Sequence, residues 1–179
     1  MLPKIDPAAA RRLLAEAGYP NGVKATIIAL VGRPVRERLA VTLQQLAKPG
    51  GFDLQVQRVP YSSFNAEVSG KAPLYIDGFF GRPTVDTSVF AFLRSGGSWN
   101  ERLWHYQNAD VDRALDAARL SADEAVQKKT YVDFQTALIA DPASFFAYAV
   151  NFACAYRKNV QGVTTHPLRW FDLRTATLT

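Results

Sequence analysis

The chain has 179 residues and a mass of 19.8 kDa, a size that favours one compact domain and excludes a large multidomain protein. Its residues are 48% hydrophobic and 21% charged, which is typical of a folded globular protein and too apolar for a disordered one. The net charge of +5 is uneven, because residues 1–100 carry 12 basic and 7 acidic groups, whereas residues 101–179 carry 9 of each. Since the densest basic group is only Arg33, Arg36 and Arg38, we expect no nucleic-acid partner.

Several other classes of protein and site are also disfavoured. The single cysteine, Cys154, excludes an internal disulfide and a cysteine-based metal cage, and we expect it to be a small buried apolar residue. Only two histidines, His105 and His166, are present, and no cofactor motif is found, so we expect neither a metal nor a cofactor. No apolar run approaches the length of a membrane span, and residues 1–6 lack the apolar core of a signal peptide.

The first half of the chain predicts a parallel crossover unit. A short helix is expected between Asp6, a suitable N-cap, and Gly18, a stop signal. Residues 23–31 are almost wholly apolar, as expected of a central strand that is covered on both faces. A helix opened by Pro34 and an alternating strand from residue 52 follow, and strand, helix and strand in this order normally form a right-handed parallel unit.

The second half is expected to begin with a short helix at 62–68, capped by Ser62 or Ser63, and a strand over 74–80. An irregular, aromatic-rich stretch follows, to residue 106. Two helices come next, one capped by Asn108 and one opened by a capping box at 121–124 and ended by residues 141–142. Residues 144–156 have an aromatic and alanine-rich strand pattern, and the remainder is rich in turns.

The irregular stretch carries the side chains best suited to bind a ligand. Large aromatic side chains in loops usually either cover the core or contact a ligand. For Trp99 both roles stay open, whereas we expect Phe90 and Phe92 to belong to the core. The guanidinium of Arg82 suits a carboxylate or phosphate, although a salt bridge with Asp86 is the alternative. A hydrolase that brings Ser98, His105 and Asp110 together is a weaker alternative, since nothing in their spacing supports it. A further alternative is a module that binds a partner protein.

Two segments resemble a known family. Residues 6–22, with the sequence DPAAARRLLAEAGYPNG, resemble the signature of the extracellular solute-binding proteins, family 5, which are the dipeptide, oligopeptide and nickel receptors of bacterial ABC importers. Residues 106–141 are similar to that family's two-helix pattern, and 160–163 resemble its closing segment. The resemblance implies an α/β fold of the periplasmic-binding-protein-like (type II) class, with a mixed, mostly parallel sheet flanked by helices.

The sequence departs from the family where the family often has a Trp followed three residues later by an Asp. Phe79 and Arg82 stand in those places, so a ligand end of opposite charge is implied. The resemblance therefore implies a small peptide-like or anionic solute. The residues that we expect to contact it are Phe79, Arg82, Asp86, Trp99, Asn100 and Asn151.

Members of the family resemble two-lobed receptors that enclose the ligand between the lobes. The resemblance implies that residues 1–179 are one lobe, the C-terminal one, and that the N-terminal lobe with its export signal lies outside this chain. The expected partners are that missing lobe and the subunits of an ABC permease. The expected location is the periplasm or the cell surface, and no enzymatic activity is expected.

Overall fold

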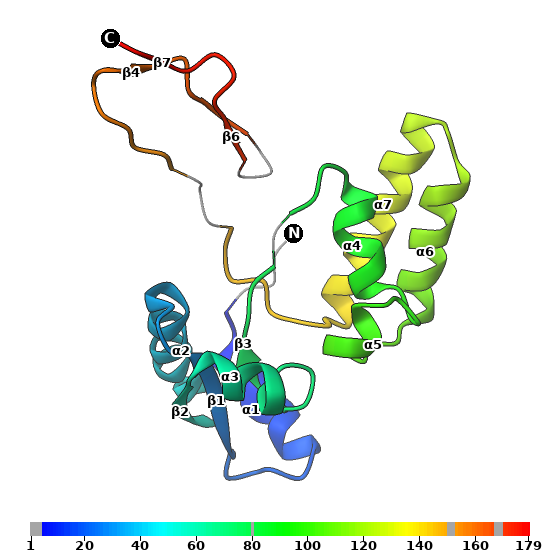
Figure 1. Ribbon diagram of the computed structural model, residues 1–179. Helices are drawn as coiled ribbons and strands as arrows, with labels where there is room; N and C mark the ends of the chain where they lie inside the picture. Colours follow the sequence, from blue (N-terminus) through cyan, green and yellow to red (C-terminus); the bar gives the residue numbers. More distant parts are fainter. Residues whose placement is uncertain (1–4, 80, 150–152, 167–169) are drawn as a thin grey trace. The chain divides into compact units, whose positions relative to one another are not determined.

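The computed structural model describes residues 5–79, 81–149, 153–166 and 170–179 (Figure 1). The chain divides into two compact units, Met1–Phe79 and Phe80–Thr179, and each has its own hydrophobic core. Sequence length favours one compact domain, whereas the structure distributes the apolar residues over these separate cores. None of the helices in the described part of the chain is long and apolar enough to cross a bilayer.

The first unit is a three-stranded parallel sheet with helices. Strand β1 (Val23–Leu30) lies between β2 (Phe52–Val59) and β3 (Tyr75–Ile76), so its predicted central position is confirmed. The register pairs Val23 with Phe52 and Leu30 with Val59 along the full length of β1 and β2. The expected strand over 74–80 is much shorter than predicted, because only Tyr75 and Ile76 pair with β1.

Helices cover both faces of this sheet. Helix α2 (Pro34–Ala47) packs its buried Ala40 against Ile27 and Leu54. On the other face, Phe64 of the π-helical turn η2 (Phe64–Val68) packs against Leu30. This turn continues α3 (Tyr61–Ser63), whose N-cap is Pro60 instead of Ser62 or Ser63. The remaining elements of the unit are α1 (Pro7–Glu16) and the 3-10 turn η1 (Lys48–Gly50).

Local sequence signals explain the ends of α1. The Asp6 side chain accepts a hydrogen bond of 2.9 Å from the backbone N–H of Ala9, and Pro7 occupies the first helical position. Gly18 follows the helix with a φ of +92°, a left-handed conformation that favours glycine. The predicted boundaries of this helix are therefore confirmed.

The second unit is built on helices α4 (Val85–Leu93), α5 (Asn100–Leu103), α6 (Ala109–Leu120) and α7 (Glu124–Ala140). Asn108 caps α6 as predicted, and α7 ends before Asp141 as predicted, but the cap of α7 is Asp123 instead of Ser121. The core of the unit joins α4, α6 and α7, and its buried members are Phe92, Leu93, Val111, Ala114, Leu115 and Phe134.

Two sequence predictions for this unit are wrong. The stretch expected to be irregular contains α4, because Thr84 and Thr87 form a capping box that starts a helix. The described residues of 144–156 form no strand, although their aromatic pattern is typical of one. A strand needs a neighbour for its backbone hydrogen bonds, and no ladder to these residues is present in the described chain. Cys154, expected to be buried, is half-buried.

Two short antiparallel ribbons complete the second unit. Strand β4 (Val160–Gln161) pairs with β7 (Thr177–Leu178), and β5 (Thr164–Thr165) pairs with β6 (Phe171–Asp172). Together with the three-stranded sheet they make an α/β fold whose largest sheet is parallel and flanked by helices, as expected.

Candidate ligand-binding surface

The start of α4 fixes the backbone of Arg82. The N–H of Arg82 donates to Ser88 Oγ at 2.9 Å, and Ser88 Oγ donates in return to the Arg82 carbonyl at 3.3 Å. Thr84 caps the same helix by accepting from the N–H of Thr87 at 3.2 Å. These contacts attach the loop that carries Arg82 to the first turns of a helix whose far end is buried.

The Arg82 guanidinium contacts an aromatic ring instead of a carboxylate. Its Cζ lies 5.9 Å from the centre of the Phe92 ring, at the outer limit of a cation–π contact. Asp86 pairs with another residue, so the salt bridge between Arg82 and Asp86 weighed from the sequence is not formed. Since a ring contact leaves the edges of a guanidinium exposed, Arg82 keeps N–H donors for an anion.

The partner of Asp86 is Arg119 of α6. Arg119 Nε and Nη2 donate to the two Asp86 oxygens at 2.6 and 2.9 Å, and its Cζ lies 3.3 Å from the centre of the Phe90 ring. The hydrogen bonds to Asp86 raise the pKa of the Arg119 guanidinium. Burial, with the Asp86 charge as a second cause, raises the pKa of Tyr131. Because both carboxylate oxygens are engaged, the structure does not support Asp86 as a ligand contact.

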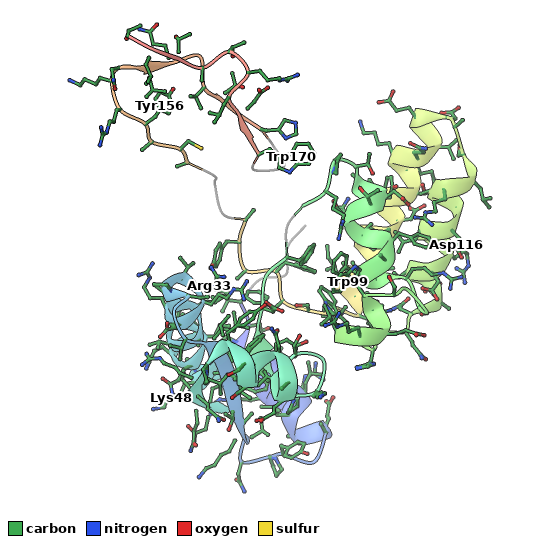
Figure 2. The ribbon with its side chains drawn as sticks, in the orientation of Figure 1. Arg33, Lys48, Trp99, Asp116, Tyr156 and Trp170 are labelled. Atoms are coloured by element: carbon green, nitrogen blue, oxygen red, sulfur yellow. The ribbon has the colours of Figure 1, made fainter. Side chains whose placement is uncertain are left out.

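Trp99 forms part of an aromatic stack. Its ring lies parallel to Phe92, with centres 5.7 Å apart and planes inclined by 11°, and it keeps 36% of its surface exposed. Arg102 Cζ lies 5.4 Å from the Trp99 centre. Trp104 adds a tilted contact of 6.4 Å to Phe92. Figure 2 labels Trp99, which extends from the α4–α5 region. Trp99 therefore contacts the core and keeps part of its surface exposed.

The side chain of Asn100, which the sequence predicts as a ligand contact, makes hydrogen bonds inside the protein. The residue is 1% exposed, and its Nδ2 donates to the carbonyls of Arg94 and Tyr106 at 2.9 and 2.7 Å. Its Oδ1 accepts from the N–H of Tyr106 at 2.8 Å. The amide thus uses its donors inside the protein to join the loop after α4 to the segment before α6.

Phe79 and Asn151 complete the set predicted from the sequence. Phe79 lies in the first unit, just beyond β3, and is 41% exposed. The segment before it is held by Arg36 of α2, whose Nη1 donates to Asp77 Oδ1 at 2.8 Å. A Cβ at Gly78 would lie 3.1 Å from Arg36 Nη2, a tight contact that a small shift of the guanidinium would relieve. Asn151 lies outside the described residues.

The structure therefore brings together only part of the predicted set. Trp99 is one ring of the aromatic stack and Arg82 lies over the other ring, Phe92, whereas Asp86 and Asn100 make internal contacts. Sequence reasoning missed Arg102, although its spacing of three residues from Trp99 places both on one side of a helical turn. We name the surface formed by Arg82, Phe92, Trp99 and Arg102 the guanidinium–aromatic surface.

The hydrolase arrangement receives no geometric support. His105 lines a hollow of about 300 Å³ between the end of α4 and the start of α6, and its lining does not include Ser98 or Asp110. Asp110 instead pairs with Arg113 at 2.8 Å. Within the described ranges, no three His, Cys, Asp or Glu side chains are grouped as a metal site would require.

Comparison with known proteins identifies the family. The model of the bacterial extracellular solute-binding proteins, family 5 (Middle) matches residues 2–101. The chain belongs to this family. Protein XP55 of Streptomyces lividans is 31% identical over 173 residues, which are 89% of this chain and 32% of that protein. The glutathione-binding protein GsiB of Pectobacterium atrosepticum is 30% identical over 184 residues, covering 97% of this chain and 36% of GsiB.

A solved structure gives the same family fold. NikZ from Campylobacter jejuni, crystallised in complex with Ni(L-His), superposes with a TM-score of 0.68 at 29% identity, over 78% of this chain and 31% of NikZ. The predicted periplasmic-binding-protein-like fold of this family-5 chain is confirmed. The family is one of binding proteins and not of enzymes, and its members are extracellular. This family-5 chain spans about a third of the length of the curated relatives that it matches.

Proposed function

We propose that this chain is part of the substrate-binding component of an ABC importer, which captures a peptide or peptide-like solute and delivers it to the permease without covalent chemistry. The observation that carries the proposal is the family match over residues 2–101. The similarity to GsiB, a protein named for binding glutathione, supports the proposal, because glutathione is a peptide-like solute. The guanidinium–aromatic surface offers this solute charged donors and the partly exposed ring of Trp99.

We propose further that residues 1–179 form the C-terminal lobe of a two-lobed receptor. The relatives are about three times as long as the matched region, which leaves room for a second lobe. In that arrangement the other lobe supplies the facing half of the binding site, and the intact receptor lies in the periplasm or on the cell surface. The permease subunits are its second partner.

The isolated 179-residue chain is expected to show no measurable affinity for a peptide solute, because half of the surface that would bury the ligand is absent. Titration calorimetry of this chain against glutathione and a series of dipeptides checks the expectation. Within this series, a dissociation constant in the micromolar range or below would show that the chain is a complete binding unit.

In the full-length receptor, Arg82→Ala is expected to weaken binding of the transported solute at least tenfold, since a charged contact that becomes desolvated in the complex is lost. Calorimetry on the wild type and the variant measures the ratio. Arg113→Ala is the matched control, because Arg113 is an exposed arginine of the same unit that pairs with Asp110. Binding within a factor of two of the wild type would remove Arg82 from the site.

A further inference from the structure

Helix α2 has an outer face that the described part of the chain leaves uncovered. Its buried Ala40 packs toward the sheet, and Arg38 faces the opposite side, because two residues turn a helix by about 200°. Aliphatic side chains are exposed beside Arg38, to 43% at Val35, 41% at Val41 and 71% at Leu46. We name these four residues, together with Arg33 and Lys48 at the two ends of the helix, the outer face of α2; Figure 2 labels the two end residues.

The acidic side chains next to this face are engaged in ion pairs inside the first unit. Glu37, the only acidic residue of α2, pairs with Arg58 of β2 at 3.1 Å, and Asp77 pairs with Arg36 at 2.8 Å. The described ranges contain no ion pair of the three cations of the outer face, which are Arg33, Arg38 and Lys48. The part of the basic excess that remains unpaired is therefore gathered on one side of one helix.

Exposed aliphatic side chains among unpaired cations suit a partner that offers both carboxylates and apolar contacts. A second copy of this chain does not suit, because a symmetric contact would bring the like charges of two outer faces together. The other lobe of the proposed receptor does not suit either. A lobe that closes over a ligand lies at the carboxyl ends of the parallel strands, whereas the outer face of α2 is turned away from the sheet.

We propose that the outer face of α2 is a docking surface for an acidic, partly apolar segment of the permease. This inference rests on the proposed receptor function, and it adds the surface and the chemistry by which the receptor recognises its permease. The unpaired cations accelerate the encounter with an acidic partner, and the aliphatic side chains stabilise the contact once it has formed.

The test measures binding of the full-length receptor to the complete permease complex of the same importer, held in nanodiscs of zwitterionic phosphatidylcholine, by biolayer interferometry. In Arg33→Glu/Arg38→Glu we expect the association rate constant at low salt to fall about tenfold or more, because attraction becomes repulsion. The difference should shrink as the salt concentration rises. In Val41→Ser/Leu46→Ser we expect dissociation to become about threefold faster or more, because apolar burial is lost.

The matched control is Arg157→Glu/Lys158→Glu, which changes the net charge by the same amount at two exposed positions of the second unit. It should associate within about twofold of the wild type, since its charges lie outside the docking surface. Arg33→Gln/Arg38→Gln removes the charges without reversing them and covers the case in which the reversed variant does not fold. This milder variant should slow association about threefold.

Association and dissociation within about twofold of the wild type in all the outer-face variants would overturn the docking surface and leave the receptor function standing. A wild-type receptor that does not bind its permease would contradict the receptor function, and with it this inference. Charge-dependent binding to protein-free nanodiscs of phosphatidylglycerol, as tight as binding to the permease, would make the membrane the partner and overturn the proposal. So would a loss of thermal stability in Arg33→Glu/Arg38→Glu that the control does not share, because another part of the receptor would then cover this face.

Discussion

Replacing Asn100 by alanine is expected to lower the free energy of unfolding by about 2 kcal/mol. The substitution removes three hydrogen bonds and leaves the N–H and carbonyl of Tyr106 without these partners in a partly buried setting, where an unmade hydrogen bond costs about 1 kcal/mol. Urea unfolding followed by tryptophan fluorescence measures the change. This readout reports the second unit, because Trp99, Trp104 and Trp170 all lie in it.

Two further variants distinguish the loss of the Asn100 amide hydrogen bonds from the general effect of shortening a side chain. Gln107→Ala removes an exposed amide from a neighbouring position and should change the unfolding free energy by less than about 0.5 kcal/mol. Asn100→Asp keeps the size and the acceptor but loses the two donors, so it should also be destabilising at neutral pH. An Asn100→Ala variant as stable as Gln107→Ala would show that these hydrogen bonds do not stabilise the second unit.

The parts of the fold with strong local signals could be predicted from the sequence. Asp6, Pro7 and Gly18 define α1 through backbone chemistry that depends only on near neighbours. The apolar run of β1 indicated burial on both faces, and Asn108 indicated the start of α6. Such signals are reliable because the atoms concerned lie within a few residues of one another.

The remaining parts depend on contacts between distant residues. The length of β3 is set by its pairing with β1, and residues 77–79 leave the sheet where Arg36, 41 positions from Asp77, holds them. Helix α4 was missed because a capping box of two threonines is a weaker sequence signal than the aromatic residues that follow it. Local patterns do not specify such distant partners.

Prediction of the candidate site is limited for the same reason, because the partners of its side chains are also distant in the sequence. Arg82 and Trp99 could be chosen from the sequence for their chemistry, but the sequence does not reveal that Asp86 would pair with Arg119, 33 positions away. That pairing changes the character of the site, because it removes the only carboxylate of the predicted set. The net charge available to a ligand therefore follows from tertiary structure and not from composition.

Leu115→Ala is expected to destabilise the second unit by about 2–5 kcal/mol, because Leu115 is 1% exposed in the core between α4, α6 and α7, and its truncation leaves a cavity. Leu120→Ala is the matched control on the same helix, since Leu120 is 88% exposed and should change stability by less than about 0.5 kcal/mol. Urea unfolding monitored by tryptophan fluorescence compares the two. Similar midpoints for both variants would mean that α6 does not bury this face, and the support beneath the guanidinium–aromatic surface would have to be sought elsewhere.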